Sequence, residues 1–287
     1  MNKNKPSKCY LCGGNEFDKL KGIVRDNKRI KVYKCKNCSL IMLNSQNHID
    51  ENFYEKGNMR SGKFSPEKWQ ENAFPDDLRR FNYLKKHIKD KNVVDFGCGA
   101  GGFIKLAKPY CKTICGIEKE EQIQDYLNNL GYSIFSSIDE INTKADFITL
   151  FHVLEHIKDP VELLKSFKEH LNNNSKVIIE VPNANDALIS LYKSKAFSHF
   201  TWWSCHLYTF NKQNLKTIAQ KAGYKINYIK NVQRYGISNH LYWLIKGKPG
   251  GHLKYSWLNI SVFDKIYAWI LSLFDKTDTI IMSISPI

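Results

Sequence analysis

The sequence lacks any long apolar run. No stretch reaches the roughly 18 uninterrupted apolar residues that a membrane-spanning helix requires, so we expect no transmembrane segment. The first residues, MNKNKPSKCYLCGG, carry charges but not the apolar core that a secretory signal needs. The chain also shows no internal repeat and no low-complexity tract. Together these absences predict a cytoplasmic protein with an ordinary folded architecture.

Acidic residues are scarce relative to basic ones. The 28 Asp and Glu residues are outnumbered by 43 Lys and Arg residues, which leaves a formal net charge of +15. Such a balance bears on solubility and on anionic partners rather than on the fold. Hydrophobic residues make up 43% of the chain and aromatic residues 13%, which excludes a disordered protein. The length of 287 residues predicts about two domains of ~150 residues.

Eight cysteines are present, and half of them form two close pairs, Cys9-x-x-Cys12 and Cys35-x-x-Cys38. Without an export signal, this number favours metal or free thiols over disulfides. Two C-x-x-C turns can direct four thiolates to one point, and Zn²⁺ takes four such ligands tetrahedrally. We therefore predict a structural zinc site, whose filled coordination shell leaves no position for catalysis. The cysteines that we interpret as buried thiols are Cys98, Cys111, Cys115 and Cys205.

Composition divides the chain into three parts. Residues 1–45 form the predicted zinc ribbon, in which GIVRDNKRIKVYKC (residues 22–35) is typical of a hairpin with Asp26-Asn27 at its turn. Residues 46–90 form a helical connector, because apolar residues recur at helical spacing over Pro66–Lys89. Residues 91–287 make up the third part.

Strands alternate with helices from Asn92 onward. Such alternation predicts a parallel sheet with helices on both faces. The expected strands are Val93–Phe96, Thr113–Ile117, Tyr132–Phe135, Asp146–Phe151, Lys176–Val181, Tyr224–Val232 and a final apolar run at Thr279–Ile284. The expected helices are Phe103–Ala107, Glu120–Leu130, Pro160–Leu171, Lys212–Ala222 and a further one within Tyr255–Phe274. The last of these helices is amphipathic and could contact a membrane surface or a second subunit, although we expect it to pack against the sheet or a domain partner.

A glycine loop follows the first of these strands, in VVDFGCGAGGF. Gly97 and Gly99 allow a tight strand-to-helix turn and a close approach of the backbone to a ligand. Glu118 ends the next strand, where a carboxylate can bind ribose hydroxyls. A dinucleotide and S-adenosylmethionine both fit this pattern. Asp95 favours S-adenosylmethionine, because a carboxylate there would repel a pyrophosphate but attract a cationic ligand.

At this point the sequence resembles the class I S-adenosylmethionine-dependent methyltransferases over roughly residues 92–235. The segments that carry the resemblance are VVDFGCGAGGF, CGIEKEEQ, ADFITLFHVLEHIKDP, VIIEVPN and HLYTFNKQNLKTIAQKAGY. The resemblance implies a Rossmann-like α/β fold with a seven-stranded sheet whose last strand is antiparallel. The preceding zinc-binding segment is similar to that of a subgroup that includes sugar methyltransferases of deoxysugar, capsule and surface-polysaccharide synthesis.

The resemblance also assigns roles to individual residues. Asp95, Gly97 and Gly99 would hold the methionine half of the cofactor, and Glu118 would bind the ribose hydroxyls. Ser137 and Ile138, after the third strand, would flank the adenine. Phe151 and His152, at the end of the fourth strand, would line the path to the methyl group. The segment around residues 184–275 would form the acceptor region.

Methyl transfer to an alcohol needs alignment behind the sulfonium methyl group and removal of one proton. Histidine suits that proton transfer near neutral pH. His156 in FHVLEH, and His199 and His206 in SHFTWWSCHLYTF, are the candidate bases, and His240 is a further one. His156 and His206 could instead be structural. Trp202 and Trp203 suit either a sugar-stacking platform or the core.

The acceptor that we favour is a sugar hydroxyl, on a nucleotide-linked sugar or a nascent surface glycan. Transfer to a sugar carbon is a close variant. RNA is a disfavoured alternative, because the fourth strand ends in FHVLEH rather than an Asn/Asp-Pro-Pro-aromatic motif, and the basic residues are dispersed. A non-catalytic module that binds S-adenosylmethionine and zinc is the remaining alternative. The sequence shows no carboxylate cluster typical of a catalytic Mg²⁺ site, and it is compatible with a homodimer.

Overall fold

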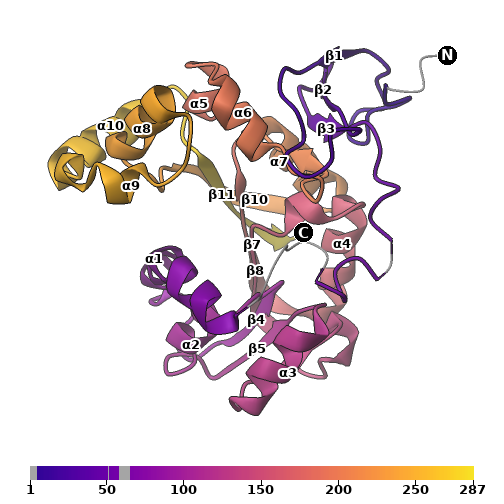
Figure 1. Cartoon of the computed structure of the whole chain (residues 1–287). Helices are drawn as coiled ribbons and strands as arrows, with labels where there is room; N and C mark the ends of the chain where they lie inside the picture. The colour runs from indigo at the N-terminus through magenta and orange to yellow at the C-terminus, as the bar shows by residue number, and fades with distance from the viewer. Residues whose placement is uncertain (1–4, 51, 58–64) are drawn as a thin grey trace.

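The computed structural model describes residues 5–50, 52–57 and 65–287. Its centre is a seven-stranded sheet that Figure 1 shows nearly edge-on. In spatial order its strands are β10 (Tyr224–Val232), β11 (Thr279–Pro286), β8 (Leu171–Pro182), β7 (Ala145–Phe151), β4 (Asn92–Phe96), β5 (Thr113–Ile117) and β6 (Ile134–Phe135). β4 to β8 pair in parallel, whereas β11 runs antiparallel to both of its neighbours. The predicted seven-stranded α/β fold is confirmed, including its antiparallel last strand.

Helices cover both faces of the sheet because its middle strands are apolar on both sides. On one face, Phe81 and Leu84 of α1 (Pro66–Leu84) and Phe103 of α2 (Gly102–Ala107) pack with Phe147 of β7. The opposite face is covered by α4 (Pro160–Ser166) and α7 (Lys212–Lys221), whose buried leucines share a core with the next residue of β7, Ile148. The remaining elements between β5 and β9 are α3 (Glu121–Asn129), η1 (Ile138–Glu140), η2 (Leu154–His156), η3 (Phe167–His170), α5 (Ala187–Ser190) and α6 (Lys195–Thr201).

The connector helix is shorter than the sequence indicates. α1 begins where the Ser65 side chain accepts a hydrogen bond from the Lys68 amide, and it ends at Leu84 rather than Lys89. Beyond Leu84 the amide of His87 bonds to the Leu84 carbonyl, which tightens the chain out of α-helical geometry. Ile88 is nevertheless completely buried. Residues 51 and 58–64 of the predicted connector lie outside the described residues.

The N-terminal strands are β1 (Phe17–Lys19), β2 (Val32–Cys35) and β3 (Ile41–Leu43). β1, not a strand beginning near Gly22, pairs with β2, so the hairpin predicted over residues 22–35 is wrong in its first strand. Asp26 does lie in the connection between these strands, within a turn closed by the Asn27 amide and the Val24 carbonyl oxygen, and both of its carboxylate oxygens accept hydrogen bonds from Ser204. β9 (Tyr208–Thr209) pairs with β3 and completes a four-stranded sheet. The N-terminal strands and the main sheet therefore share one core.

A helical insertion separates β10 from β11 and comprises α8 (Ile237–Lys246), α9 (Gly251–Lys254), η4 (Ser256–Leu258) and α10 (Ser261–Leu273). Figure 1 shows these helices gathered at one end of the molecule. A helix within Tyr255–Phe274 is thus confirmed. It meets the sheet at the edge strand β10, where Asn231 Nδ2 donates to the Ser272 carbonyl oxygen, and Leu271 is the one buried residue of α10. None of the described helices is long and apolar enough to cross a bilayer.

Candidate active site

A cavity of about 990 Å³ opens at the carboxyl ends of β4, β5 and β7. Ligands of parallel α/β sheets bind at this edge, outside the strand ends. The cavity wall combines α1, the glycine loop after β4, the loop after β7 and the segment before β9. Most of the residues that sequence analysis singled out meet here: Asp95, Gly97, Gly99, Glu118, Phe151, His152, His156, Trp203 and His206. Arg234 and Tyr235, which follow β10, also line the cavity.

The glycine loop has the backbone shape that only glycine adopts easily. Gly97 has a φ of 72° and Gly99 a φ of 51°, both in the left-handed region. A Cβ atom on Gly97 would lie 2.5 Å from Val153 Cγ2, and one on Gly99 would lie 2.8 Å from the Trp69 ring. The absence of side chains here therefore keeps the loop closely packed beneath the cavity.

Asp95 is the carboxylate at the bottom of the cavity. It is 3% exposed, and its Oδ1 accepts a hydrogen bond of 2.7 Å from Thr149 Oγ1. Burial raises the pKa of Asp95 to about 7, because a buried carboxylate loses its hydration. The group is therefore poised to ionise when a cation approaches.

Glu118 links the glycine loop to the loop after β5. Its Oε2 accepts a 2.9 Å hydrogen bond from the Gly99 amide. Its Oε1 accepts hydrogen bonds from the amides of Lys119 (2.8 Å) and Glu120 (3.1 Å). Three backbone donors thus fix the carboxylate at the cavity wall, where the sequence placed a ribose-binding group.

Two of the expected cofactor residues do not line this cavity among the described residues. Ser137 is the N-cap of η1, and its amide donates to Glu140 Oε1 at 3.0 Å. Ile138 is 5% exposed because it packs into the main core. Their placement beside a bound adenine stays a prediction.

His152 is fixed by its neighbours rather than free. It has a φ of 59°, which is unusual for a residue with a side chain. Arg234 Nη1 lies 3.0 Å from His152 Nε2, and a guanidinium group can only donate. Nε2 also lies 3.4 Å from Glu180 Oε1, and Nδ1 lies 3.3 Å from Glu155 Oε1, so the ring is held between two carboxylates and a guanidinium group.

A buried network of charges beneath the cavity was missed by sequence analysis. Glu180 is completely buried on β8, and its Oε1 accepts from Arg79 Nη2 and Arg80 Nε, each at 2.9 Å. Burial opposes its ionisation, yet contacts with His152 and both guanidinium groups hold the pKa of Glu180 well below its usual range. The signal in the sequence was the helical spacing of Asp77 and Arg80 with Phe81 and Leu84, which places two charges on the apolar face of α1.

The same network reaches the segment after β10. Arg234 Nε donates to Asp76 Oδ1 at 3.1 Å, and the Arg234 amide donates to the Asp278 carboxylate. Arg80 Nη1 donates to Asp77 Oδ1 at 3.0 Å. α1 is therefore tied by ion pairs both to β8 and to the residues that precede α8.

A pair of imidazoles lies on the other side of the cavity. The rings of His156 and His206 are 4.9 Å apart between centroids, and the ring of Trp203 is 5.4 Å from that of His206. His156 Nδ1 lies 2.9 Å from the Cys205 carbonyl oxygen, which can only accept, so Nδ1 carries the proton and Nε2 keeps its lone pair.

Both imidazoles are neutral near pH 7. Desolvation in the cavity wall and the neighbouring His156 lower the pKa of His206 to about 3. Desolvation also lowers the pKa of His156. Glu155 opposes both shifts, because contact with His152 lowers the pKa of Glu155 despite its burial and keeps it ionised. Its Oε2 is buried without a hydrogen-bond partner in the described part of the chain.

Two further histidines lie outside the cavity lining in the described ranges. His199 is on α6, which ends at Trp202. The Trp202 indole is 4% exposed and donates to the Lys21 carbonyl oxygen, so this segment is held against the N-terminal strands, away from the cavity. His240 is buried on α8, with Nδ1 2.6 Å from the Tyr267 hydroxyl. The structure does not support either residue as a base. Of the two tryptophans, Trp202 belongs to the core and Trp203 to the cavity.

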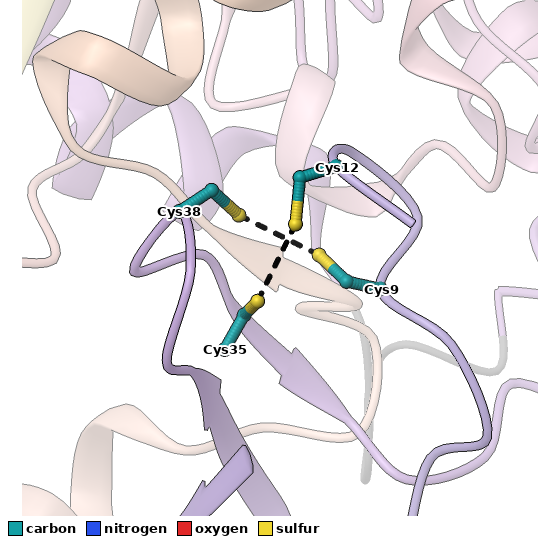
Figure 2. A group of neighbouring side chains, drawn as sticks. All are labelled: Cys9, Cys12, Cys35 and Cys38. Carbon is teal, nitrogen blue, oxygen red and sulfur yellow. Dashed lines mark hydrogen bonds between the residues drawn. The ribbon is translucent and has the colours of Figure 1, made fainter. Parts of the chain in front are cut away.

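The four paired cysteines meet at one point, as Figure 2 shows. Cys9 Sγ lies 3.5 Å from Cys38 Sγ, and Cys12 Sγ lies 3.5 Å from Cys35 Sγ. All four sulfurs lie within 4.8 Å of one another, as tetrahedral Zn²⁺ ligands must. The donor set therefore fits a structural zinc ion. A second group that could hold a metal consists of His156, Cys205 and His206.

Comparison with known proteins covers more than half of the chain. The family model described as "Methyltransferase domain" matches residues 67–229. A tRNA U34 carboxymethyltransferase of Sulfurimonas denitrificans is 26% identical over 42% of this chain and 43% of its own length. A ubiquinone biosynthesis O-methyltransferase of Coxiella burnetii is 27% identical over 37% of this chain and 50% of its own length.

The chain thus spans about half the length of these curated relatives. Among solved structures, a SAM-dependent methyltransferase from Archaeoglobus fulgidus has a TM-score of 0.51 at 19% identity. The match covers 82% of this chain and 99% of that protein. At this identity the likeness shows a shared fold.

Proposed function

This chain belongs to the methyltransferase domain family, and from that premise we propose that it transfers a methyl group from S-adenosylmethionine to a sugar hydroxyl. One observation carries the proposal. The buried carboxylate, the glycine loop and Glu118 face the same cavity as a pair of neutral imidazoles and an aromatic ring. One cavity would thus hold the cofactor beside a proton acceptor, as methyl transfer to an alcohol requires.

We assign the cofactor side to the residues at the ends of β4 and β5. Asp95 would attract the ammonium end of the cofactor, and a bound cation would lower its raised pKa and keep it ionised. Gly97 and Gly99 allow the tight turn that brings the loop backbone to the cavity, and Glu118 would accept hydrogen bonds from ribose hydroxyls. The cofactor, when bound, supplies the electrophilic methyl group on its sulfonium.

We assign the base to the imidazole pair, with His206 as the proton acceptor. A proton taken from a hydroxyl would leave an imidazolium facing the ionised carboxylate of Glu155. The charge of that carboxylate would stabilise the imidazolium and so offset the burial that lowers the pKa of His206. A positioned base of this kind contributes about 10²- to 10⁴-fold to the rate. His156 is the alternative base, through its free Nε2 lone pair.

The lining of the acceptor side supports a sugar. The Trp203 ring can stack on the C–H face of a sugar ring. The Arg25 guanidinium lies 4.1 Å from the centroid of the Trp203 ring. A guanidinium at the cavity also suits a phosphate carried by a nucleotide-linked sugar. Transfer to a sugar carbon would use the same base beside a ketone and is a second candidate.

An RNA acceptor is the alternative suggested by the name of a tRNA-modifying relative. The tRNA-modifying relative matches 42% of this chain at 26% identity, which is too little to transfer an acceptor. The imidazoles and tryptophan of the acceptor side suit a hydroxyl more than an exocyclic base amine. A non-catalytic binding module is the remaining rival, and it predicts cofactor binding without transfer.

The test follows the methyl group. Methyl-labelled S-adenosylmethionine is incubated with the protein and with separated nucleotide-sugar, polysaccharide and RNA fractions. We expect label in a sugar fraction, loss of label in Glu118→Ala, and a rate lowered about 10²-fold or more in His206→Ala. His199→Ala is the matched control, because this histidine lies outside the cavity lining, and it should retain full activity. Label in RNA would contradict the sugar assignment, and binding without transfer to any fraction would contradict enzyme activity.

A further inference from the structure

The helical insertion between β10 and β11 exposes an unusual amount of apolar surface. Trp257 is 73% exposed, Trp269 is 62% exposed and Phe274 is 70% exposed. We define the insertion face by its exposed large apolar residues: Leu244, Ile245, Leu253, Trp257, Ile260, Val262, Phe263, Ile266, Trp269, Ile270, Leu273 and Phe274. So many exposed large apolar side chains on one segment mark an interaction site in a folded protein.

α10 has two distinct sides. Its inner side carries Asp264, Tyr267 and Leu271, spaced three and four residues apart, and each contacts the protein or is buried. Asp264 Oδ1 accepts from the Ile237 amide, and the Tyr267 hydroxyl contacts His240. Trp269 and the other apolar residues of α10 turn outward. The outer side is therefore a genuine amphipathic surface with no partner in the described chain.

The charges around this face have one sign. Lys246, Lys248, Lys254 and Lys265 are exposed on the same elements, and none forms an ion pair with a described residue. The acidic residues of the segment are turned inward or paired. Asp264 bonds to α8, as described above, and Asp275 contacts Asn185 and Lys212.

We propose that the insertion face docks on the surface of an anionic lipid bilayer. Exposed tryptophans and phenylalanines among lysines are the composition of a helix that lies in a membrane interface. Anionic headgroups would attract the lysines, at short range, while the apolar side chains enter the acyl boundary. A second copy of the chain fits less well, because a two-fold contact would bring the same unpaired lysines together.

Docking there would place the candidate active site close to the membrane. Arg234 and Tyr235 line the cavity and directly precede α8, whose first residue is tied to α10 through Asp264. If the proposed methyl transfer is correct, the acceptor reached from this position would be a glycan on a lipid carrier. The docking itself does not depend on that function.

Vesicle sedimentation tests the proposal directly. The full-length protein is mixed with vesicles of phosphatidylcholine alone or with added phosphatidylglycerol. We expect at least tenfold more binding to the anionic vesicles, falling as salt is raised. The double variant Phe263→Glu with Trp269→Glu should lose this binding. Lys254→Glu with Lys265→Glu should lose the preference for anionic lipid and leave the apolar face intact.

Leu130→Glu is the matched control, since Leu130 is 54% exposed on the distant end of α3. It should bind vesicles like the unchanged protein. Calorimetry with S-adenosylmethionine shows that each variant is folded, because none of these residues lines the cavity. Equal binding by the Phe263/Trp269 variant would overturn the proposal. Failure of the unchanged protein to bind either kind of vesicle would also overturn it. If light scattering then shows a dimer that Trp269→Glu dissociates, the insertion face joins two copies of the chain instead.

Discussion

Asp95 is a carboxylate in a place where water cannot stabilise its charge. It sits at the end of β4, 3% exposed, with Thr149 as its hydrogen-bond donor. A single residue of this type connects the protonation state of the protein to ligand binding, because the ionised form alone attracts a cation. Its pKa of about 7 places that change within the working range of most enzymes.

We therefore expect cofactor affinity to depend on pH through Asp95. Burial raises its pKa, so the carboxylate is ionised above pH 7 and protonated below it. S-adenosylmethionine should bind more weakly as pH falls from 8 to 6, by about tenfold for each unit below the pKa. Isothermal titration calorimetry at several pH values measures this directly.

Asp95→Asn should bind weakly at every pH, since it has no charge to lose. Asp139→Asn, which changes a carboxylate outside the cavity lining, should keep the pH dependence of the unchanged protein. A pH dependence that survives in Asp95→Asn would show that another group controls binding.

At the scale of elements, the N-terminal strands and the acceptor side of the cavity are one structure. β9 pairs with β3, and Asn214 of α7 donates to the carbonyl oxygen of Cys38. Ser204, which precedes His206 by two residues, donates hydrogen bonds to Asp26. The cysteine cluster thus supports the segment that carries the proposed base, although its four sulfurs lie outside the cavity lining.

Removing the metal should consequently affect both stability and catalysis. We expect about one Zn²⁺ per chain by elemental analysis, and Cys35→Ser or a strong chelator should lower the melting temperature by roughly 5 °C or more. Activity should fall as well, because the segment around His206 loosens.

Cys111→Ser is the control, since Cys111 lies apart from the cluster and has no metal-binding neighbours among the described residues. It should retain zinc and melt near the unchanged protein. An unchanged melting temperature in Cys35→Ser would mean that the four thiols do not hold a structural ion.

At the scale of the whole molecule, buried ion pairs join parts that are far apart in sequence. Arg79 and Arg80 of α1 bind Glu180 of β8, and Arg234 binds Asp76. These contacts connect the helix before the main sheet with the middle of the sheet and with the beginning of the helical insertion. The network therefore holds the cavity wall together from three directions.

Glu180→Gln should be strongly destabilising, by about 3–5 kcal/mol in the free energy of unfolding. The substitution keeps the shape of the side chain but removes the buried charge that Arg79 and Arg80 share, which leaves them only Asp76 and Asp77 as ion-pair partners. Urea unfolding monitored by circular dichroism measures the difference.

The comparison variant is Glu162→Gln, which removes an exposed ion pair with Lys165. Solvent screens that pair, so the expected loss is no more than about 1 kcal/mol. Similar losses for the two variants would show that the buried network contributes little to stability.

Local patterns in the sequence determined much of this protein. Alternating apolar strands and helices were sufficient for the seven-stranded fold, and a strand followed by glycines was sufficient for the cavity edge. Asp95, Glu118, His156 and His206 were found in the same way, because each lies next to a strand end or in a polar break between apolar runs. These inferences need only neighbours in the chain.

Tertiary structure decided what depends on residues distant in sequence. Ser137 and His199 lie on the expected segments, yet neither lines the cavity: Ser137 caps η1, and the Trp202 indole that follows α6 binds the Lys21 carbonyl oxygen. The Arg79–Glu180 pair joins residues on different elements, so no spacing could reveal it. α10 has the amphipathic pattern of a core helix but remains exposed, because the sheet faces are already covered by other helices. A periodic pattern predicts that a helix has an apolar side. Only the tertiary structure determines what that side contacts.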